Sequence, residues 1–167
     1  MQQLGDFATG LNLQRLGVRR WYETGATLHA THYEILAESL LCHGQTAAAR
    51  THLSAARTHR ESYGEDYLAA EIDRVEASLL KSEQAPAETV EQCLANSLST
   101  ARQQEARLLE LRAATSLARL WGEQGRRSEA RELLAPVSGW FTEGFDTADL
   151  KEAKAQLESL LSIISAV

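Results

Sequence analysis

Apolar residues recur every three or four positions along most of this chain, and short polar turns interrupt them at regular intervals. This spacing places apolar side chains on one face of an α-helix, and the two-residue alternation of a β-strand is absent from the sequence. The pattern therefore predicts an all-α fold. The helices that we expect are a leading helix at 6–23, three pairs at 27–43 with 46–62, 65–81 with 86–104, and 106–122 with 127–138, and a capping helix at 148–164.

The chain also repeats itself. The segment "EILAESLLCHGQTAAARTHL" (34–53) aligns with "TSLARLWGEQGRRSEARELL" (115–134) at a shift of 81 residues. The identities are Leu36 with Leu117, Ala37 with Ala118, Gly44 with Gly125, Ala49 with Ala130, Arg50 with Arg131 and Leu53 with Leu134. Each copy has a helix, a glycine where a helix commonly ends, and a second helix. A weaker third copy lies between them, with Glu76 at a position where a small residue is expected and "KSEQAP" in its turn.

This order of residues resembles the tetratricopeptide repeat: a Leu-small pair, an aromatic or apolar residue, a turn, an alanine and a larger apolar residue. The matching positions are Leu117, Ala118, Trp121, Gly125, Ala130 and Leu134. The resemblance implies a right-handed α-α superhelix that forms one tetratricopeptide-like domain over residues 1–167, with repeats at about 27–62, 65–104 and 106–138. The copies begin about 39 and 42 residues apart rather than 34, which implies longer helices or loops.

The segment 110–160, above all "GWFTEGFDTADLKEAK", is similar to the C-terminal repeat tail of bacterial multidomain signalling ATPases. These are class III adenylate cyclase/AAA ATPase proteins and LuxR-type regulators. The resemblance implies a regulatory, non-catalytic tail whose partner is a protein, a peptide or another domain of the same parent chain. Cyclase and ATPase motifs are absent from the sequence. The leading helix corresponds to half a repeat, which fits either a fragment of a larger protein or a natural short protein.

Composition and charge reduce the number of possible functions further. The formal net charge of -6 and the pI of about 5.4 disfavour binding to nucleic acid, because an acidic surface repels phosphates. No apolar run is long enough for a membrane span, and no signal peptide opens the chain, so we expect a cytoplasmic location and no membrane partner.

Catalytic and metal motifs are equally lacking, and we expect no enzyme, cofactor or metal. "GEQGRR" (122–127) lacks the Lys-Ser/Thr pair of a phosphate-binding loop and follows a helix, so we interpret it as an inter-helix turn with solvated arginines. The five histidines show no zinc-binding arrangement. Glu34 and Glu38 lie four residues apart and could bind a cation, but exposed helix faces often carry such pairs.

The groove lined by the first helices of successive repeats is the best candidate for a binding site. Its predicted residues are Glu34, Glu38, Asp73, Arg112, Thr115 and Arg119. They form an acidic end and a basic end, which could orient a charged partner. Two alternatives remain: a sensory module of a STAND-type ATPase or cyclase that binds a small effector, and a self-association domain that dimerises through the C-terminal helix and "LLSIISAV". The aromatic loop "GWFTEGF" (139–145) is either a recognition hot spot or, as we favour, a seal under the last helix.

Overall fold

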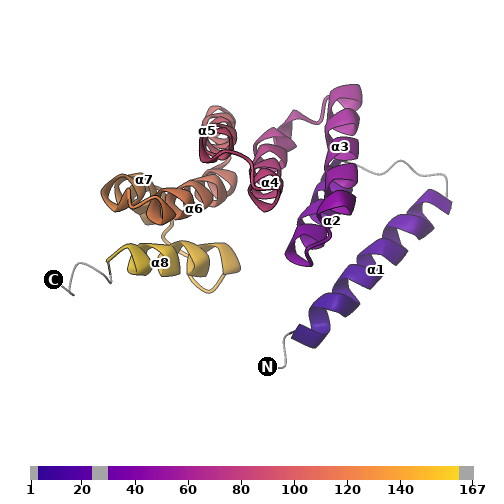
Figure 1. Ribbon diagram of the computed structural model, residues 1–167, viewed down its shortest axis with the longest axis horizontal. Coiled ribbons are helices and arrows are strands. Elements are labelled where there is room, and N and C mark those ends of the chain that lie inside the picture. The colour runs from indigo at the N-terminus through magenta and orange to yellow at the C-terminus, as the bar shows by residue number, and fades with distance from the viewer. Residues whose placement is uncertain (1–3, 24–29, 162–167) are drawn as a thin grey trace.

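The computed structural model describes residues 4–23 and 30–161, and every regular element in these ranges is a helix (Figure 1). The all-α expectation is therefore confirmed. The helices are α1 (Leu4–Glu23), α2 (Ala30–Cys42), α3 (Thr46–Tyr63), α4 (Ala69–Ser82), α5 (Ala87–Gln103), α6 (Arg107–Glu123), α7 (Arg127–Gly139) and α8 (Ala148–Leu161), with a short 3₁₀ helix η1 (Asp66–Leu68) before α4. None of the described helices is both long and apolar enough to cross a membrane.

The helices pack as consecutive pairs. α2 packs chiefly on α3, α4 on α5, and α6 on α7, and the second helix of each pair also contacts the first helix of the next element. The first helices touch in turn, because α2 contacts α4, α4 contacts α6, and α6 contacts α8. Figure 1 shows this progression, with α1 beside α2 at one end and α8 beside α6 and α7 at the other. The helices α2, α4, α6 and α8 thus form one continuous layer.

The observed helices occupy the predicted places, with shifts of a few residues. The largest shift is at the fourth expected helix, which begins at Ala69 rather than at residue 65 because η1 precedes it. Parts of two predicted helices, residues 27–29 and 162–164, lie outside the described residues. The assignment of the whole chain to one domain stays a prediction.

The core consists of two apolar clusters that meet at α4. The first cluster joins α1 to α4 and includes Leu36, Leu53 and Val75, and the second joins α4 to α8 and includes Leu117 and Leu134. The aligned residues of the two strong sequence copies have equivalent burial. Ala37, after Leu36, and Ala118, after Leu117, are both fully buried. Because alanine has almost no side chain, the helices can approach closely at these points.

The turn inside each helix pair has the same backbone form. One residue adopts a left-handed conformation, and the amide after it donates to a carbonyl five residues earlier, as from Gln45 to the Leu40 oxygen at 2.9 Å. In the first and third pairs that residue is Gly44, with φ of 68°, or Gly125, with φ of 82°, as the sequence predicts. In the middle pair it is Gln84, with φ of 59°. The weaker repeat keeps the turn without its glycine.

The aromatic loop only partly follows the expected seal. Phe141 packs against the second apolar cluster, whereas Trp140 is 58% and Phe145 is 64% exposed. The Trp140 ring contacts Phe141 edge to face and lies 5.4 Å from the Arg107 guanidinium. One ring of the three therefore closes the core, and α8 packs on α6 and α7 at the same end.

We predict opposite effects for two substitutions in these turns. Gly44→Ala is expected to lower the free energy of unfolding by about 1 kcal/mol, because alanine pays the left-handed backbone cost. An added Cβ meets no atom within 4 Å there, so the loss measures the backbone alone. Gln84→Gly is expected to raise the free energy of unfolding by about 0.5 kcal/mol. Glycine removes the cost of the left-handed backbone at this turn, and this gain exceeds the loss from the conformational entropy that glycine adds to the unfolded chain. Urea denaturation measures both; a neutral Gly44→Ala would contradict the assigned turn.

Candidate functional site

A polar groove of about 390 Å³ runs along the layer of first helices. It draws residues from α2, α4, α6 and α8, so all three pairs and the last helix contribute to it. The lining residues are Glu38, Leu41, Cys42, Arg74, Ser78, Arg112, Thr115, Ser116, Arg119, Asp149 and Glu152. Three arginines and three carboxylates thus face one shallow volume.

The structure brings four of the six predicted groove residues into this lining: Glu38, Arg112, Thr115 and Arg119. Thr115 is buried, and its hydroxyl donates to the Leu111 carbonyl at 2.8 Å. Glu34 lies one helical turn before Glu38 on α2 and is buried.

Asp73 lies on a different face of α4. Its carboxylate pairs with Arg57 of α3 at 3.3 Å, and its carbonyl accepts a bond from the Cys93 thiol of α5. Burial is the main influence on this carboxyl and raises the pKa of Asp73. Asp73 therefore contributes to packing between the pairs rather than to the groove lining.

Arg112 is the central cation of the groove. Its Nη1 donates to Glu71 Oε1 on α4 at 3.0 Å, and its Nε and Nη2 donate to the two carboxylate oxygens of Asp149 on α8 at 2.8 and 3.1 Å. The hydrogen bond with Asp149 is the largest influence that raises the pKa of Arg112, and the negative charge of Glu71 adds to it. One guanidinium therefore connects three helices.

Arg74 and Arg119 make the other ion pairs. Arg74 donates through Nε and Nη2 to both oxygens of Glu71, at 3.1 and 2.8 Å, and also bonds to Glu38 of α2. Burial works against its charge, yet the contacts with Glu71 and Glu38 raise the pKa of Arg74. Arg119 pairs with Glu152 of α8 at the exposed rim. The lining thus carries a carboxylate on α2, arginines on α4 and α6, and carboxylates on α8, and its charges are paired with one another rather than separated into the acidic and basic ends that we expected.

Glu34 differs from the other carboxylates of the region. It is 3% exposed, and its Oε1 has no hydrogen-bond partner in the described part of the chain. Loss of water on burial, then repulsion from Glu71 and Glu38, raises the pKa of Glu34 to about 8, against the smaller opposing effects of Arg74 and Arg112. At neutral pH this carboxyl therefore retains a proton.

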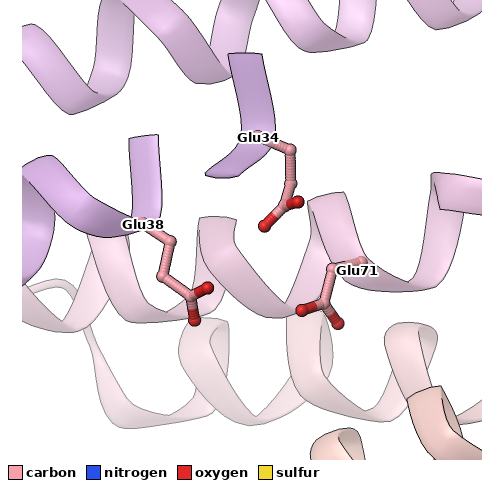
Figure 2. Close-up of side chains that lie close together, drawn as sticks. All are labelled: Glu34, Glu38 and Glu71. Carbon is pink, nitrogen blue, oxygen red and sulfur yellow. The ribbon is translucent and has the colours of Figure 1, made fainter. Parts of the chain in front are cut away.

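The carboxylates of Glu34, Glu38 and Glu71 converge between α2 and α4, as Figure 2 shows. Each of the three offers an oxygen, and these oxygens all lie within 4.8 Å of one another. Among the described residues this is the one group of three with the spacing of metal ligands, and no histidine belongs to it. Figure 2 shows the Glu34 side chain directed toward the other two.

Sequence reasoning missed Glu71, Arg74 and Asp149. Glu71 and Arg74 are three residues apart and therefore share a face of α4, which is a readable signal. The partners of that face on α2, α6 and α8 depend on how the pairs stack, which no local pattern specifies. Asp149 falls inside the predicted helix at 148–164, where the sequence assigned it no role, although its carboxylate connects α8 to Arg112 of α6.

The first arginine of the turn "GEQGRR", Arg126, makes more contacts than expected. Arg126 pairs with Glu91 at 2.8 Å and with Glu129 at 2.8 Å, and it lies 4.5 Å from the centre of the Trp121 ring. Trp121 also donates to Glu91 at 2.8 Å. Arg126 therefore joins the second and third pairs while 33% of its side chain stays exposed, so it has a packing role beyond that of the solvated turn residue that we expected.

We predict that the two groove arginines differ in their effect on stability. Arg112→Ala is expected to lower the free energy of unfolding by about 2 kcal/mol, because it leaves the buried Glu71 and the partly exposed Asp149 short of a partner. Arg119→Ala is expected to cost less than about 0.5 kcal/mol, since its pair with Glu152 is exposed. Urea denaturation of both variants compares them directly; equal losses would show that Arg112 does not hold the helices together.

We also predict a pH dependence that originates at Glu34. The native pKa of about 8 exceeds the ordinary value of 4.5, so the folded state binds the extra proton between these values. Stability is thus fully present below pH 4.5 and falls as the pH rises to about 8, by at most about 1.4 kcal/mol per pH unit. Glu34→Gln should remove this fall and be more stable than the parent above pH 8. Chemical denaturation from pH 5 to 9 measures it; parallel profiles for parent and variant would contradict it.

Comparisons with known proteins add nothing to this geometry: no family model, no curated protein and no solved structure matches the chain. The groove itself is therefore the main guide to function.

Proposed function

We propose that this chain is a non-catalytic protein-binding module that holds an extended or helical peptide segment in the groove of α2, α4, α6 and α8. The observation that carries the proposal is the groove lining, to which all three helix pairs and α8 contribute. A surface that repeats along a stack of pairs suits a linear partner, which can contact each pair in turn.

The superhelical form of the tetratricopeptide repeat belongs to the same proposal. It is supported by the equivalent burial of the aligned leucines and alanines in the two strong copies and by the shared left-handed turn. A parent signalling protein, with this module as its regulatory tail in the cytoplasm, is supported by the resemblance of segment 110–160 and by that alone.

The character of the groove favours a peptide over a small effector. Small-molecule pockets are lined mainly by apolar and aromatic side chains, whereas the lining here is mostly charged or hydroxylated. Catalysis finds little support, because no hydroxyl or thiol of the lining is hydrogen-bonded to a histidine or carboxylate among the described residues. Dimerisation through the C-terminal helix stays a prediction: Leu160 is buried and Leu161 is exposed, and the rest of "LLSIISAV" lies outside the described residues.

Selection of peptides from a random phage-displayed library tests the proposal, with affinities then measured by fluorescence anisotropy. We expect selected peptides to bind with roughly micromolar dissociation constants. Ser116→Trp places a large ring in the groove and should weaken binding at least about tenfold, because the ring occupies the volume of the peptide. The matched control is Ser99→Trp on the exposed face of α5, which should bind like the parent.

Two results would contradict the proposal. One is failure of the folded chain to select any peptide. The other is equal binding by Ser116→Trp and the parent, which would place the contact outside the groove. Light scattering on the same samples determines whether the parent is monomeric and keeps self-association separate from peptide binding.

A further inference from the structure

The three converging carboxylates have the dimensions of a cation site. Because the oxygens of Glu34, Glu38 and Glu71 lie within 4.8 Å of one another, a point between them exists at no more than about 2.8 Å from each. Calcium binds oxygen at about 2.3–2.6 Å and magnesium at about 2.0–2.1 Å. This upper bound lies close to the calcium distance, and calcium tolerates irregular coordination, whereas magnesium requires near-ideal octahedral geometry.

A second observation, apart from the grouping of acids, points to a ligand at this place. Glu34 is almost fully buried and directed toward the other two carboxylates (Figure 2), and its Oε1 has no hydrogen-bond partner among the residues that the structure describes. A buried carboxylate without a partner costs free energy, and most buried polar atoms in proteins are paired. A cation between the three side chains would supply the missing partner.

The charge balance among the side chains of this region agrees with a bound divalent cation. When ionised, Glu34, Glu38, Glu71 and Asp149 carry four negative charges, and Arg74 and Arg112 supply two positive charges through their ion pairs with this group. The difference is two negative charges. One divalent cation would neutralise it, whereas a monovalent cation or a single proton would leave one charge uncompensated.

We propose that Glu34, Glu38 and Glu71 form a binding site for one hard divalent cation, with calcium preferred to magnesium, between α2 and α4. All three ligands are carboxylate oxygens, which hard cations prefer. Glu38 also lines the groove, whose volume of about 390 Å³ has room for water molecules that complete the coordination.

The two arginines are compatible with this assignment. Each carboxylate has about four lone-pair positions, so an oxygen that accepts from a guanidinium can still face a cation. Arg74 holds both oxygens of Glu71 and contacts Glu38, and Arg112 holds Glu71 from α6. Hydrogen bonds of this kind commonly orient the carboxylates that bind a metal. Arg74 and Arg112 therefore act as positioning residues.

Isothermal titration calorimetry of the full chain with calcium chloride at pH 9, above the raised pKa of Glu34 so that this carboxyl is ionised before calcium is added, tests the proposal. We expect one calcium ion per chain with a dissociation constant of about 10⁻⁵–10⁻³ M, and weaker binding of magnesium. Glu34→Gln and Glu38→Gln each remove one charged ligand and should weaken calcium binding at least about tenfold. Glu61→Gln, an exposed substitution of the same charge change on α3, is the matched control and should bind like the parent.

Absence of saturable heat up to about 10 mM calcium would overturn the proposal, because this exceeds the weakest protein calcium sites. Equal loss in Glu61→Gln and Glu34→Gln would also overturn it, since it would indicate a diffuse response to net charge. Magnesium binding as tight as calcium binding would overturn the calcium preference. Circular dichroism of each variant establishes that it is folded, and none of these readouts depends on whether a peptide binds the groove.

Discussion

Glu71 is the constraint on which the arrangement of the first helices depends. It is buried on α4 and carries a charge that two guanidiniums must compensate, Arg74 from its own helix and Arg112 from α6. Arg74 extends the contact to α2 through Glu38, and Arg112 extends it to α8 through Asp149. A charge that is costly to bury thereby fixes the neighbours of α4 on both sides.

Apolar packing alone specifies the neighbours of α4 less strictly. The alanines at the helix contacts allow close approach but specify little about register, because their side chains make few distinctive contacts. Directional bonds between guanidinium and carboxylate groups require particular distances and orientations. The layer of α2, α4, α6 and α8 thus combines a permissive core with specific polar links, and the groove is the exposed side of those links.

The helices could be predicted from sequence because their signals are local. Apolar spacing predicted the eight α-helices of the described residues, and Gly44 and Gly125 marked two of the turns correctly. The turn at Gln84 was read as an irregular insertion, since no glycine signals its left-handed residue.

The site was harder to predict than the helices. Repeat positions correctly placed Glu38, Arg112, Thr115 and Arg119 in the groove, but Asp73 contacts α3 and α5 instead. Whether a charge faces the groove or another helix depends on the stacking of pairs, which the sequence encodes only indirectly.

The two apolar clusters of the core have a consequence for how the molecule comes apart. They share one helix, α4, which contributes Ile72, Val75 and Leu79 to the first and Ala77 to the second. Loss of the contacts among α1, α2 and α3 leaves the second cluster complete, whereas loss of α4 removes part of both. The chain therefore contains two cooperative unfolding units with their boundary at α4. Amide exchange in α2 and α3 can proceed by sub-global opening while α6 and α7 remain protected.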